Sequence, residues 1–565
     1  MALEMTDALR VELDKCVKKF MRKRNVKGVS AAVVGVEGPL YEATFGVVDA
    51  EGTPNDPDKK MMIGSNTKLL TALAILTLVE KGKLELDKDI GTYLSGFEIR
   101  SRFPEKAITI RQILSHTSGL SCDSFSLLMD EDACLNDILP FLSESYLIAE
   151  PGTMPAYSNI GFGVLGLIIE ACSGKTYTEY LETAVLTPLG LSVEILETKA
   201  KREAAKARIS GCFDKKGKPV EDALGAIISA GSNTYASLRD MERFLLFFLA
   251  PEKQTLLKPE TLMEMFLPPR EGDLEQRAIK FNLGLMHDYF HFNHLDAGAF
   301  TGHGGSTATH HSVFHWLKAH GLGFTVLTNS TKGMFAAREI QTTMAVACLK
   351  ALGVHVPKKK PPVPLKQEPT EVNTAKTYVG NGLKIPVKTR KDGQKDMKLS
   401  FMRARLRQAE DGLFRLQPRG VTRFPLFALV LKMLRFGFTS AHGRDVCLIE
   451  QRMPYGSIVT HFAEAYEAVP LPDDWKKAKG SYELRDAPPA LKKALTKMKL
   501  SIVKGDPLLK MTILQQPGIM HLKALGDGEA IVRGYGRNAG ETVRIEHIDG
   551  DTHLTFMGMR LKKKR

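Results

Sequence analysis

Ser65 and Lys68 lie three residues apart at the start of a long apolar segment. On a helix, residues with this spacing share one face, one turn apart, so we expect the Lys68 amine beside the Ser65 hydroxyl. The next residues, 69–79, are apolar on nearly every side, which is typical of a buried helix. Burial disfavours a charged lysine and leaves a neutral amine that can accept the serine proton. The spacing therefore predicts a nucleophilic serine with a lysine base.

The position of Ser65 near the predicted helix start adds a second property. The N–H groups of a first helical turn have no partner inside the helix, so the Ser65 N–H can face negative charge that develops on a bound acyl group. A Ser-x-x-Lys pair is nevertheless short enough to occur by chance in a chain of 565 residues. Whether it is catalytic depends on residues elsewhere in the chain.

A loop at residues 150–160 contains Tyr157 and Asn159 near its end. A tyrosine hydroxyl close to a lysine amine has its ionised form favoured, so Tyr157 could take the serine proton and later give it to a leaving group. The Asn159 amide could bind a substrate carbonyl and position the lysine. The alternative interpretation of this segment is a turn with an ordinary exposed tyrosine.

Residues 301–307, Thr-Gly-His-Gly-Gly-Ser-Thr, precede a segment with strand character. Glycines at the start of a strand allow a second backbone to approach closely, and the Ser306 N–H could face an incoming carbonyl oxygen. His303 could bind a carboxylate or assist the proton transfer, although a lone buried histidine is more often only hydrogen-bonded. The other histidines between residues 287 and 315 lack metal-ligand spacing with carboxylates, so no metal site is expected.

The elements that would position these residues form an α+β pattern. An amphipathic helix is predicted at 8–24 and a β-hairpin at 28–36 and 40–46. Further helices are predicted at 160–172, 237–249, 258–266 and 336–352, and further strands at 308–316 and 323–329. The helix at 237–249 begins with a capping-box pair, Ser237 and Asp240. Strands near both ends with helices between them predict one sheet built from distant segments plus a helical lobe.

The C-terminal part has a different pattern. Prolines and lysines at 357–373 predict a semi-rigid linker. Short β-like segments separated by Gly, Asp and Asn turns follow, which is typical of antiparallel sheets or small barrels. We therefore predict a catalytic domain at 1–356, the linker at 357–373, and β-rich domains at 374–470 and 471–565. The apolar segment 424–434 is longer than the other strands and is not assigned.

Composition and charge limit the class of protein. Hydrophobic residues make up 43% and charged residues 25%, as in soluble globular proteins. The net charge of +14 comes from residues 376–565, with 36 Lys and Arg against 19 Asp and Glu, whereas residues 1–356 have 38 against 43. A solvated basic surface is a commoner cause than an acidic partner. No RNA-binding motif, zinc finger or stacking pattern accompanies the charge, so no nucleic-acid partner is expected.

Three features favour a cytoplasmic location. Residues 1–14 carry acids and lack the apolar core of a secretory signal. The apolar segment after Ser65 is too short, and too interrupted by threonine, to predict a membrane span. Seven scattered cysteines without Cys-x-x-Cys spacing favour a reducing compartment over a disulfide framework. The sequence leaves open whether the chain forms a homo-oligomer.

Three motifs together resemble a known family. Ser65-x-x-Lys68, Tyr157-Ser-Asn159 and His303-Gly-Gly, in this order, resemble the active-site elements of the penicillin-recognising serine hydrolases, in the class C β-lactamase-like branch. Segments 78–90, 114–120, 151–153 and 230–240 also resemble that family, so the likeness extends over about residues 8–352. The resemblance implies a β-lactamase-like fold for this part of the chain.

The resemblance also implies a role for each residue. Ser65 would form the acyl-enzyme, and Lys68 and Tyr157 would share the proton transfers. Asn159 would orient the substrate, and the N–H groups of Ser65 and Ser306 would form the oxyanion hole. The implied reaction is acyl transfer to water or another acceptor, and it needs no metal or organic cofactor.

The third element departs from the family pattern. Many members have Lys-Thr-Gly where this chain has His303-Gly304-Gly305, so a neutral or switchable imidazole replaces a fixed ammonium. This variant resembles the branch that contains D-aminopeptidases, esterases and mitochondrial β-lactamase-like proteases. D-aminopeptidases of that branch also have two antiparallel barrels after the catalytic domain.

We therefore expect a serine hydrolase that cleaves amide or ester bonds of small molecules or short peptides, with little β-lactamase activity. One alternative is an acyltransferase on the same fold, which would pass the acyl group to an alcohol. A second alternative is a non-catalytic binding protein with a vestigial site.

Overall fold

The computed structural model describes residues 2–220, 230–267, 280–287, 300–356 and 376–565, the last range with gaps at 381, 400–401, 410–411, 420–433, 442–443, 454–455, 468, 486, 504, 514–515 and 527. The predicted linker at 357–373 and nearly all of the unassigned segment 424–434 lie outside these residues. Among the described residues, no helix has the length and apolar character needed to cross a membrane.

A seven-stranded antiparallel sheet forms the centre of the N-terminal part, with strand order β2-β1-β12-β11-β10-β9-β8. Its strands are β1 (Gly28–Gly35), β2 (Gly38–Gly46), β8 (Lys280–Phe281), β9 (Met286–His287), β10 (Phe300–Ser306), β11 (His311–Leu317) and β12 (Leu322–Thr328). The predicted hairpin is confirmed as β1–β2, and β1 also pairs with β12 over seven residues. Distant chain segments thus form one sheet, as the sequence predicts.

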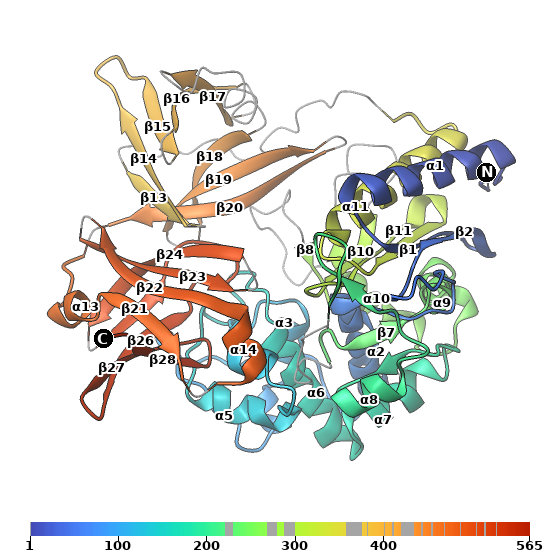
Figure 1. Cartoon of the computed structure of the whole chain (residues 1–565), viewed down its shortest axis with the longest axis horizontal. Coiled ribbons are helices and arrows are strands. Elements are labelled where there is room, and N and C mark those ends of the chain that lie inside the picture. Colours follow the sequence, from blue (N-terminus) through green and yellow to red (C-terminus); the bar gives the residue numbers. More distant parts are fainter. Residues whose placement is uncertain are drawn as a thin grey trace.

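Helices cover both faces of this sheet (Figure 1). The helices of this part are α1 (Asp7–Arg24), α2 (Thr67–Glu80), α3 (Ile110–Leu114), α4 (Phe125–Leu128), α5 (Ile138–Ser143), α6 (Asn159–Ser173), α7 (Tyr177–Leu181), α8 (Lys199–Ala204), α9 (Leu238–Leu249), α10 (Pro259–Met263) and α11 (Gly333–Ala351). Alternate residues of β1 face opposite sides: Val29, Ala31 and Val33 pack in the cluster with α1 and α11. Ala32 and Val34 pack in the cluster with α2 and α9. β1 is buried along its whole length because both of its faces are covered.

α2 is the most buried helix of the lobe that carries the predicted nucleophile. Every residue from Thr67 to Leu78 is buried, which confirms the buried helix expected from the apolar segment. Ser237 and Asp240 form the predicted capping box at the start of α9. The strand predicted at 308–316 begins only at His311, because Thr307 closes a turn by accepting a hydrogen bond from the His310 N–H at 2.9 Å. Short strands complete this part: β3 (Met61–Met62), β4 (Glu194–Ile195), β5 (Cys212–Phe213), β6 (Pro219–Val220) and β7 (Thr234–Ala236).

Two closed antiparallel barrels of eight strands each follow. The first barrel contains β13 (Thr377–Gly380), β14 (Leu383–Thr389), β15 (Lys395–Leu399), β16 (Met402–Gln408), β17 (Phe414–Arg419), β18 (Leu434–Ala441), β19 (Arg444–Met453) and β20 (Gly456–Tyr466). The second contains β21 (Gly480–Leu484), β22 (Leu495–Val503), β23 (Asp506–Ile513), β24 (Gln516–Gly526), β25 (Glu529–Val532), β26 (Thr542–Ile548), β27 (Asp551–Phe556) and β28 (Met559–Lys563), with short helices α13 (Asp473–Lys477) and α14 (Pro489–Ala494) beside it. The barrel-like fold predicted for the C-terminal part is confirmed.

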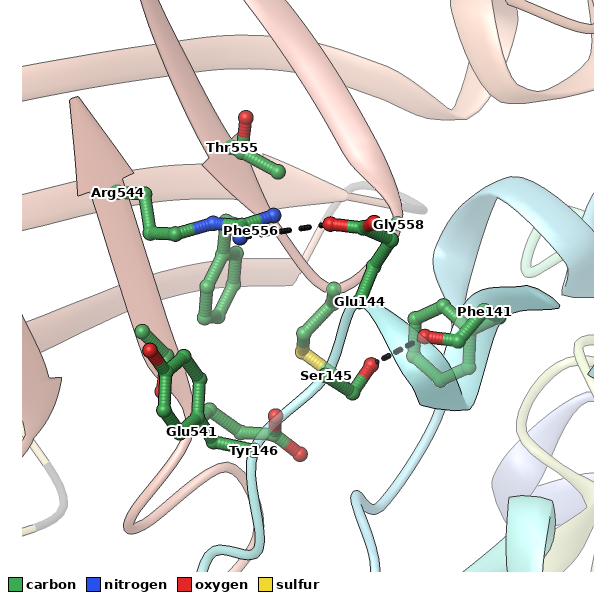
Figure 2. Close-up of a pocket in the computed structure, with 11 residues that line it drawn as sticks. Phe141, Glu144, Ser145, Tyr146, Glu541, Arg544, Thr555, Phe556 and Gly558 are labelled. Carbon is green, nitrogen blue, oxygen red and sulfur yellow. Dashed lines mark hydrogen bonds and ion pairs between the residues drawn. The ribbon is translucent and has the colours of Figure 1, made fainter. Parts of the chain in front are cut away.

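The second barrel packs against the helical lobe, and the first barrel lies above it in Figure 1. At the contact with the lobe, the Phe125 N–H donates to the Met557 carbonyl at 2.9 Å. Arg102 forms an ion pair with Glu529 at 2.7 Å. A crevice of about 70 Å³ lies between the two parts, and Figure 2 shows the residues that line it. Arg544 and Glu144 form an ion pair there at 3.7 Å. Hydrogen bonds and ion pairs therefore join the second barrel to the lobe.

The segment between β25 and β26, which we call the 533–541 loop, lies where all three parts meet. Tyr535 forms an apolar cluster with Val446 and Leu448 of the first barrel, and Met154 of the N-terminal part packs against this cluster. A Cβ at Gly540 would lie only 2.2 Å from the Ile148 carbonyl oxygen, so glycine allows the loop to approach the N-terminal part closely. The loop thus contacts the segment that precedes Tyr157.

Candidate active site

Ser65 lies in a short turn, Gly64–Asn66, immediately before α2. The end of β10 runs directly against this turn. A Cβ at Gly64 would lie 2.7 Å from the Ser306 nitrogen, and a Cβ at Gly305 would lie 1.8 Å from the Ile63 carbonyl oxygen. Only residues without a Cβ permit this approach, which places the Ser306 N–H beside the serine turn. This geometry allows the two N–H groups to face one oxyanion.

Two side chains contact the Ser65 hydroxyl. The Tyr157 hydroxyl donates a hydrogen bond to Ser65 Oγ at 2.9 Å, and Lys68 Nζ lies 3.2 Å from the same oxygen. Ser65 and Tyr157 are partly exposed, whereas Lys68 is completely buried. The predicted nucleophile is thus partly exposed, while the lysine beside it is shielded from water.

The surroundings of Lys68 favour a neutral amine. Burial lowers the pKa of Lys68 to about 7. Its Nζ lies 2.7 Å from Asn159 Oδ1 and 2.9 Å from the Gly231 carbonyl oxygen. A neutral amine has two N–H bonds and one lone pair, and the two carbonyl-type oxygens accept the two N–H bonds. The lone pair is then left for the Ser65 proton, which is the arrangement that a general base requires.

Tyr157 is a neutral phenol, contrary to our expectation. Desolvation raises the pKa of Tyr157 well above its usual value and outweighs the hydrogen bond to Ser65, which lowers it. Its ring stacks on His116 with 4.2 Å between centroids, and His116 Nδ1 accepts a hydrogen bond from the Ser158 N–H at 3.1 Å. The expectation was wrong because proximity to Lys68 does not compensate for lost solvation.

His303 lies in β10 with only 1% of its surface exposed. Its Nδ1 lies 2.7 Å from the Gly304 carbonyl oxygen, and its ring centroid is 6.4 Å from that of Tyr157. Burial lowers the pKa of His303 to about 3, so the imidazole is neutral at physiological pH. The third sequence element therefore reaches the site but supplies no cation there.

Asn159, the first residue of α6, connects the site to residues that the sequence did not indicate. Its Nδ2 donates to Asp123 Oδ1 at 2.7 Å. Asp123 has 2% of its side chain exposed and accepts hydrogen bonds on Oδ2 from Nε of Arg537, at 3.1 Å, and from Nη2 of the same residue. Arg537 belongs to the 533–541 loop of the second barrel. A glycine cluster at 534, 536 and 540 is the only sequence signal for such a loop.

The predicted site residues therefore meet around Ser65: Lys68, Tyr157, Asn159, His303, Gly304, Gly305 and Ser306. Among the described residues, no group of three His, Cys, Asp or Glu side chains could hold a metal ion. The histidines at 291 and 294, and the side chain of His287, lie outside what the structure describes.

Comparison with known proteins agrees with this geometry. The model of the Beta-lactamase family matches residues 13–348, which is more than half of the chain. The chain belongs to the beta-lactamase family. Among curated proteins, the family member resembles Protein flp of Staphylococcus aureus (strain N315), with 30% identity over 253 residues, 44% of this chain and 50% of the relative. Beta-lactamase-like protein 2 of Dictyostelium discoideum is 31% identical over 271 residues, 46% of this chain and 48% of the relative. The chain thus spans about half the length of these curated relatives.

Solved structures share the fold of this chain. The crystal structure of SurE superposes with a TM-score of 0.58 at 21% identity, covering 80% of this chain and 99% of that one. An octameric penicillin-binding protein homologue from Pyrococcus abyssi has a TM-score of 0.53 at 21% identity, covering 82% of this chain and 100% of that one. Both likenesses extend beyond residues 13–348, and at these identities they concern the fold alone.

Proposed function

We propose that this beta-lactamase family member is a serine hydrolase that forms an acyl-enzyme at Ser65 and cleaves amide or ester bonds of small substrates. One observation carries the proposal: Ser65 Oγ lies 2.9 Å from the Tyr157 hydroxyl and 3.2 Å from Lys68 Nζ. The lysine is buried, its pKa is about 7, and its two N–H bonds have other acceptors. A serine held in this way is an activated nucleophile.

Acylation begins when Lys68 accepts the Ser65 proton and Ser65 Oγ attacks the substrate carbonyl carbon. The N–H groups of Ser65 and Ser306 stabilise the oxyanion that forms. The bond to the leaving nitrogen or oxygen then breaks. Tyr157 gives its proton to the leaving atom and receives the proton held by Lys68, so the site returns to its initial protonation state. Deacylation repeats these steps in reverse, with water as the nucleophile and Ser65 as the leaving group.

The neutral His303 supports peptidase or esterase activity over β-lactamase activity. A β-lactam antibiotic carries a carboxylate, and a fixed ammonium at the third element would attract it. An imidazole whose pKa is about 3 provides no such charge at neutral pH. We therefore propose small amides, esters or short peptides as substrates. The proposal includes a cytoplasmic location, which cell fractionation tests.

Labelling and turnover test this function. The purified full chain and the Ser65→Ala variant are treated with a fluorophosphonate and examined by intact-mass and peptide mass spectrometry. Both proteins are also assayed with p-nitrophenyl esters, D-aminoacyl amides and nitrocefin. We expect one adduct, on Ser65 of the native chain only, and turnover of esters or amides with little nitrocefin hydrolysis.

Three other outcomes would each contradict a different part of the proposed function. An adduct that persists in Ser65→Ala would exclude Ser65 as the nucleophile. A native chain that neither labels nor turns over any substrate would favour a binding protein with a vestigial site. Formation of a new ester when an alcohol is added to the assay, at the expense of hydrolysis, would identify an acyltransferase.

A further inference from the structure

The 533–541 loop contacts other parts of the molecule near both of its ends. Gly534 has φ +100°, and a Cβ there would lie 2.6 Å from the Gly380 Cα of the first barrel. At the other end, Glu541 accepts hydrogen bonds from Ser121 Oγ at 2.7 Å and from the Cys122 N–H at 2.8 Å. These contacts fix the loop directly against the segment that contains Asp123.

Arg537 is the loop residue that pairs with Asp123. The carboxylate is 2% exposed and the guanidinium side chain is 59% exposed, so pairing compensates a buried charge while the cation keeps much of its hydration. Without Arg537, Asp123 would be a buried carboxylate with no described cation bound to it. The pairing therefore permits a carboxylate at this depth.

Asp123 in turn fixes the orientation of the Asn159 amide. Asp123 Oδ1 can only accept, so the Asn159 NH₂ group must face it, at 2.7 Å. The Asn159 Oδ1 atom then faces Lys68 Nζ, also at 2.7 Å. The reversed amide would direct its N–H bonds toward the lysine and would leave one N–H of the lysine without an acceptor.

Asp123 and Arg537 carry opposite charges, and both change the pKa of Lys68. The charged and titratable groups around Lys68 in the described part of the chain are Asp123, Arg537, Cys122, His116, His303, Tyr157 and, behind Cys122, Glu541. Desolvation keeps His116 and His303 neutral and raises the pKa of Cys122 and Tyr157. The negative Asp123 raises the pKa of Lys68, and the positive Arg537 lowers it.

We infer that the second barrel completes the catalytic site: Arg537 fixes Asp123, and Asp123 orients Asn159 toward Lys68. Asp123 and Arg537 are positioning residues, since neither contacts Ser65 in the described contacts. This inference rests on the proposed function, in which Lys68 is the base. It assigns a catalytic task to a domain outside the matched residues 13–348.

The test is the pH dependence of Ser65 labelling in the full chain. The rate of fluorophosphonate labelling is measured between about pH 5.5 and 9.5 for the native protein and its variants. In Arg537→Ala, the uncompensated Asp123 favours the lysine ammonium, so the midpoint moves up by about one pH unit. The rate at pH 7 then falls about fivefold and recovers at high pH. Arg537→Lys, which keeps the charge, restores most of the rate.

Asp123→Asn gives the opposite shift, toward lower pH, because it removes the negative charge and leaves Arg537. This second variant keeps the test valid if Arg537→Ala does not fold. The matched control is Arg102→Ala, which removes a 2.7 Å ion pair between the same two parts of the molecule away from Ser65. Its midpoint stays at the native value.

Two outcomes would overturn the inference. Midpoints that are the same in the native chain, Arg537→Ala and Asp123→Asn would show that the pair does not act on Lys68. An equal shift in Arg102→Ala would show that docking of the barrel in general, and not Arg537, sets the midpoint. Absence of labelling in the native chain would instead refute the proposed function, so the two failures are distinguishable.

Discussion

Glu541 gives the sharpest prediction for stability. It is 5% exposed and accepts hydrogen bonds from Ser121 Oγ and the Cys122 N–H, neither of which carries a charge. Burial raises the pKa of Glu541 from 4.5 to about 7. Such a carboxyl binds more protons in the folded protein than in the unfolded chain. The stability that Glu541 contributes therefore falls as pH rises from about 4.5 to about 7 and is constant above that range.

The size of the effect follows from the shift in pKa. At about 1.4 kcal/mol per pKa unit, the change corresponds to roughly 3 kcal/mol. We expect Glu541→Gln to remove this pH dependence, because an amide oxygen still accepts from Ser121 and Cys122 but does not ionise. Urea unfolding of the full chain, followed by tryptophan fluorescence, measures it. The two tryptophans report on different parts: Trp316 lies in β11 and Trp475 in α13.

A matched control lies in the same interface. The pKa of Glu529 lies below its usual value. Burial alone would raise this pKa, but the hydrogen bonds with Arg102 and Tyr146 lower it by more. Glu529 therefore stabilises at neutral pH, and this stabilisation is lost on acidification, so Glu529→Gln destabilises at pH 7 and not in acid. If Glu541→Gln keeps the pH dependence of the native chain, the assignment of that dependence to Glu541 is wrong.

Three further predictions concern the site. The labelling rate of the native chain rises with pH through about 7 as Lys68 loses its proton, and Lys68→Ala lowers it by at least about a hundredfold at every pH. Tyr157→Phe lowers kcat about a hundredfold or more with KM little changed, since it removes a proton donor; a change in KM alone would contradict this role. Gly305→Ala destabilises the protein by about 1–3 kcal/mol or more in thermal unfolding, because the added Cβ would lie 1.8 Å from the Ile63 carbonyl oxygen. The control Gly518→Ala, where a Cβ has no neighbour closer than 3.9 Å, does not destabilise it.

The parts of this protein that the sequence predicted are those specified by neighbouring residues. The apolar segment after Ser65 predicts a buried helix, and Ser237 with Asp240 predicts the start of α9; both depend on contacts within a few residues. The glycines at 304 and 305 predicted a close backbone approach, and Gly305 does lie against Ile63. In these cases the residue type alone restricts the conformation.

The missed residues depend on contacts between distant segments. Arg537 and Asp123 are 414 positions apart, and nothing in either segment specifies that the second barrel docks on the lobe in this orientation. The ionisation of Tyr157 was mispredicted for a related reason. Its pKa depends on how much solvent the folded chain removes, and spacing along the sequence does not contain that quantity.

The junction of the 533–541 loop also has a consequence for how related chains diversify. Tyr535 clusters with the first barrel, Met154 packs against that cluster, and Arg537 contacts Asp123. A substitution in either barrel that moves this loop can therefore alter the reactivity of Ser65 with every motif residue unchanged. Two chains with identical Ser-x-x-Lys, Tyr-Ser-Asn and His-Gly-Gly elements can then differ in rate, and a mutant library confined to one surface loop becomes a means of tuning turnover.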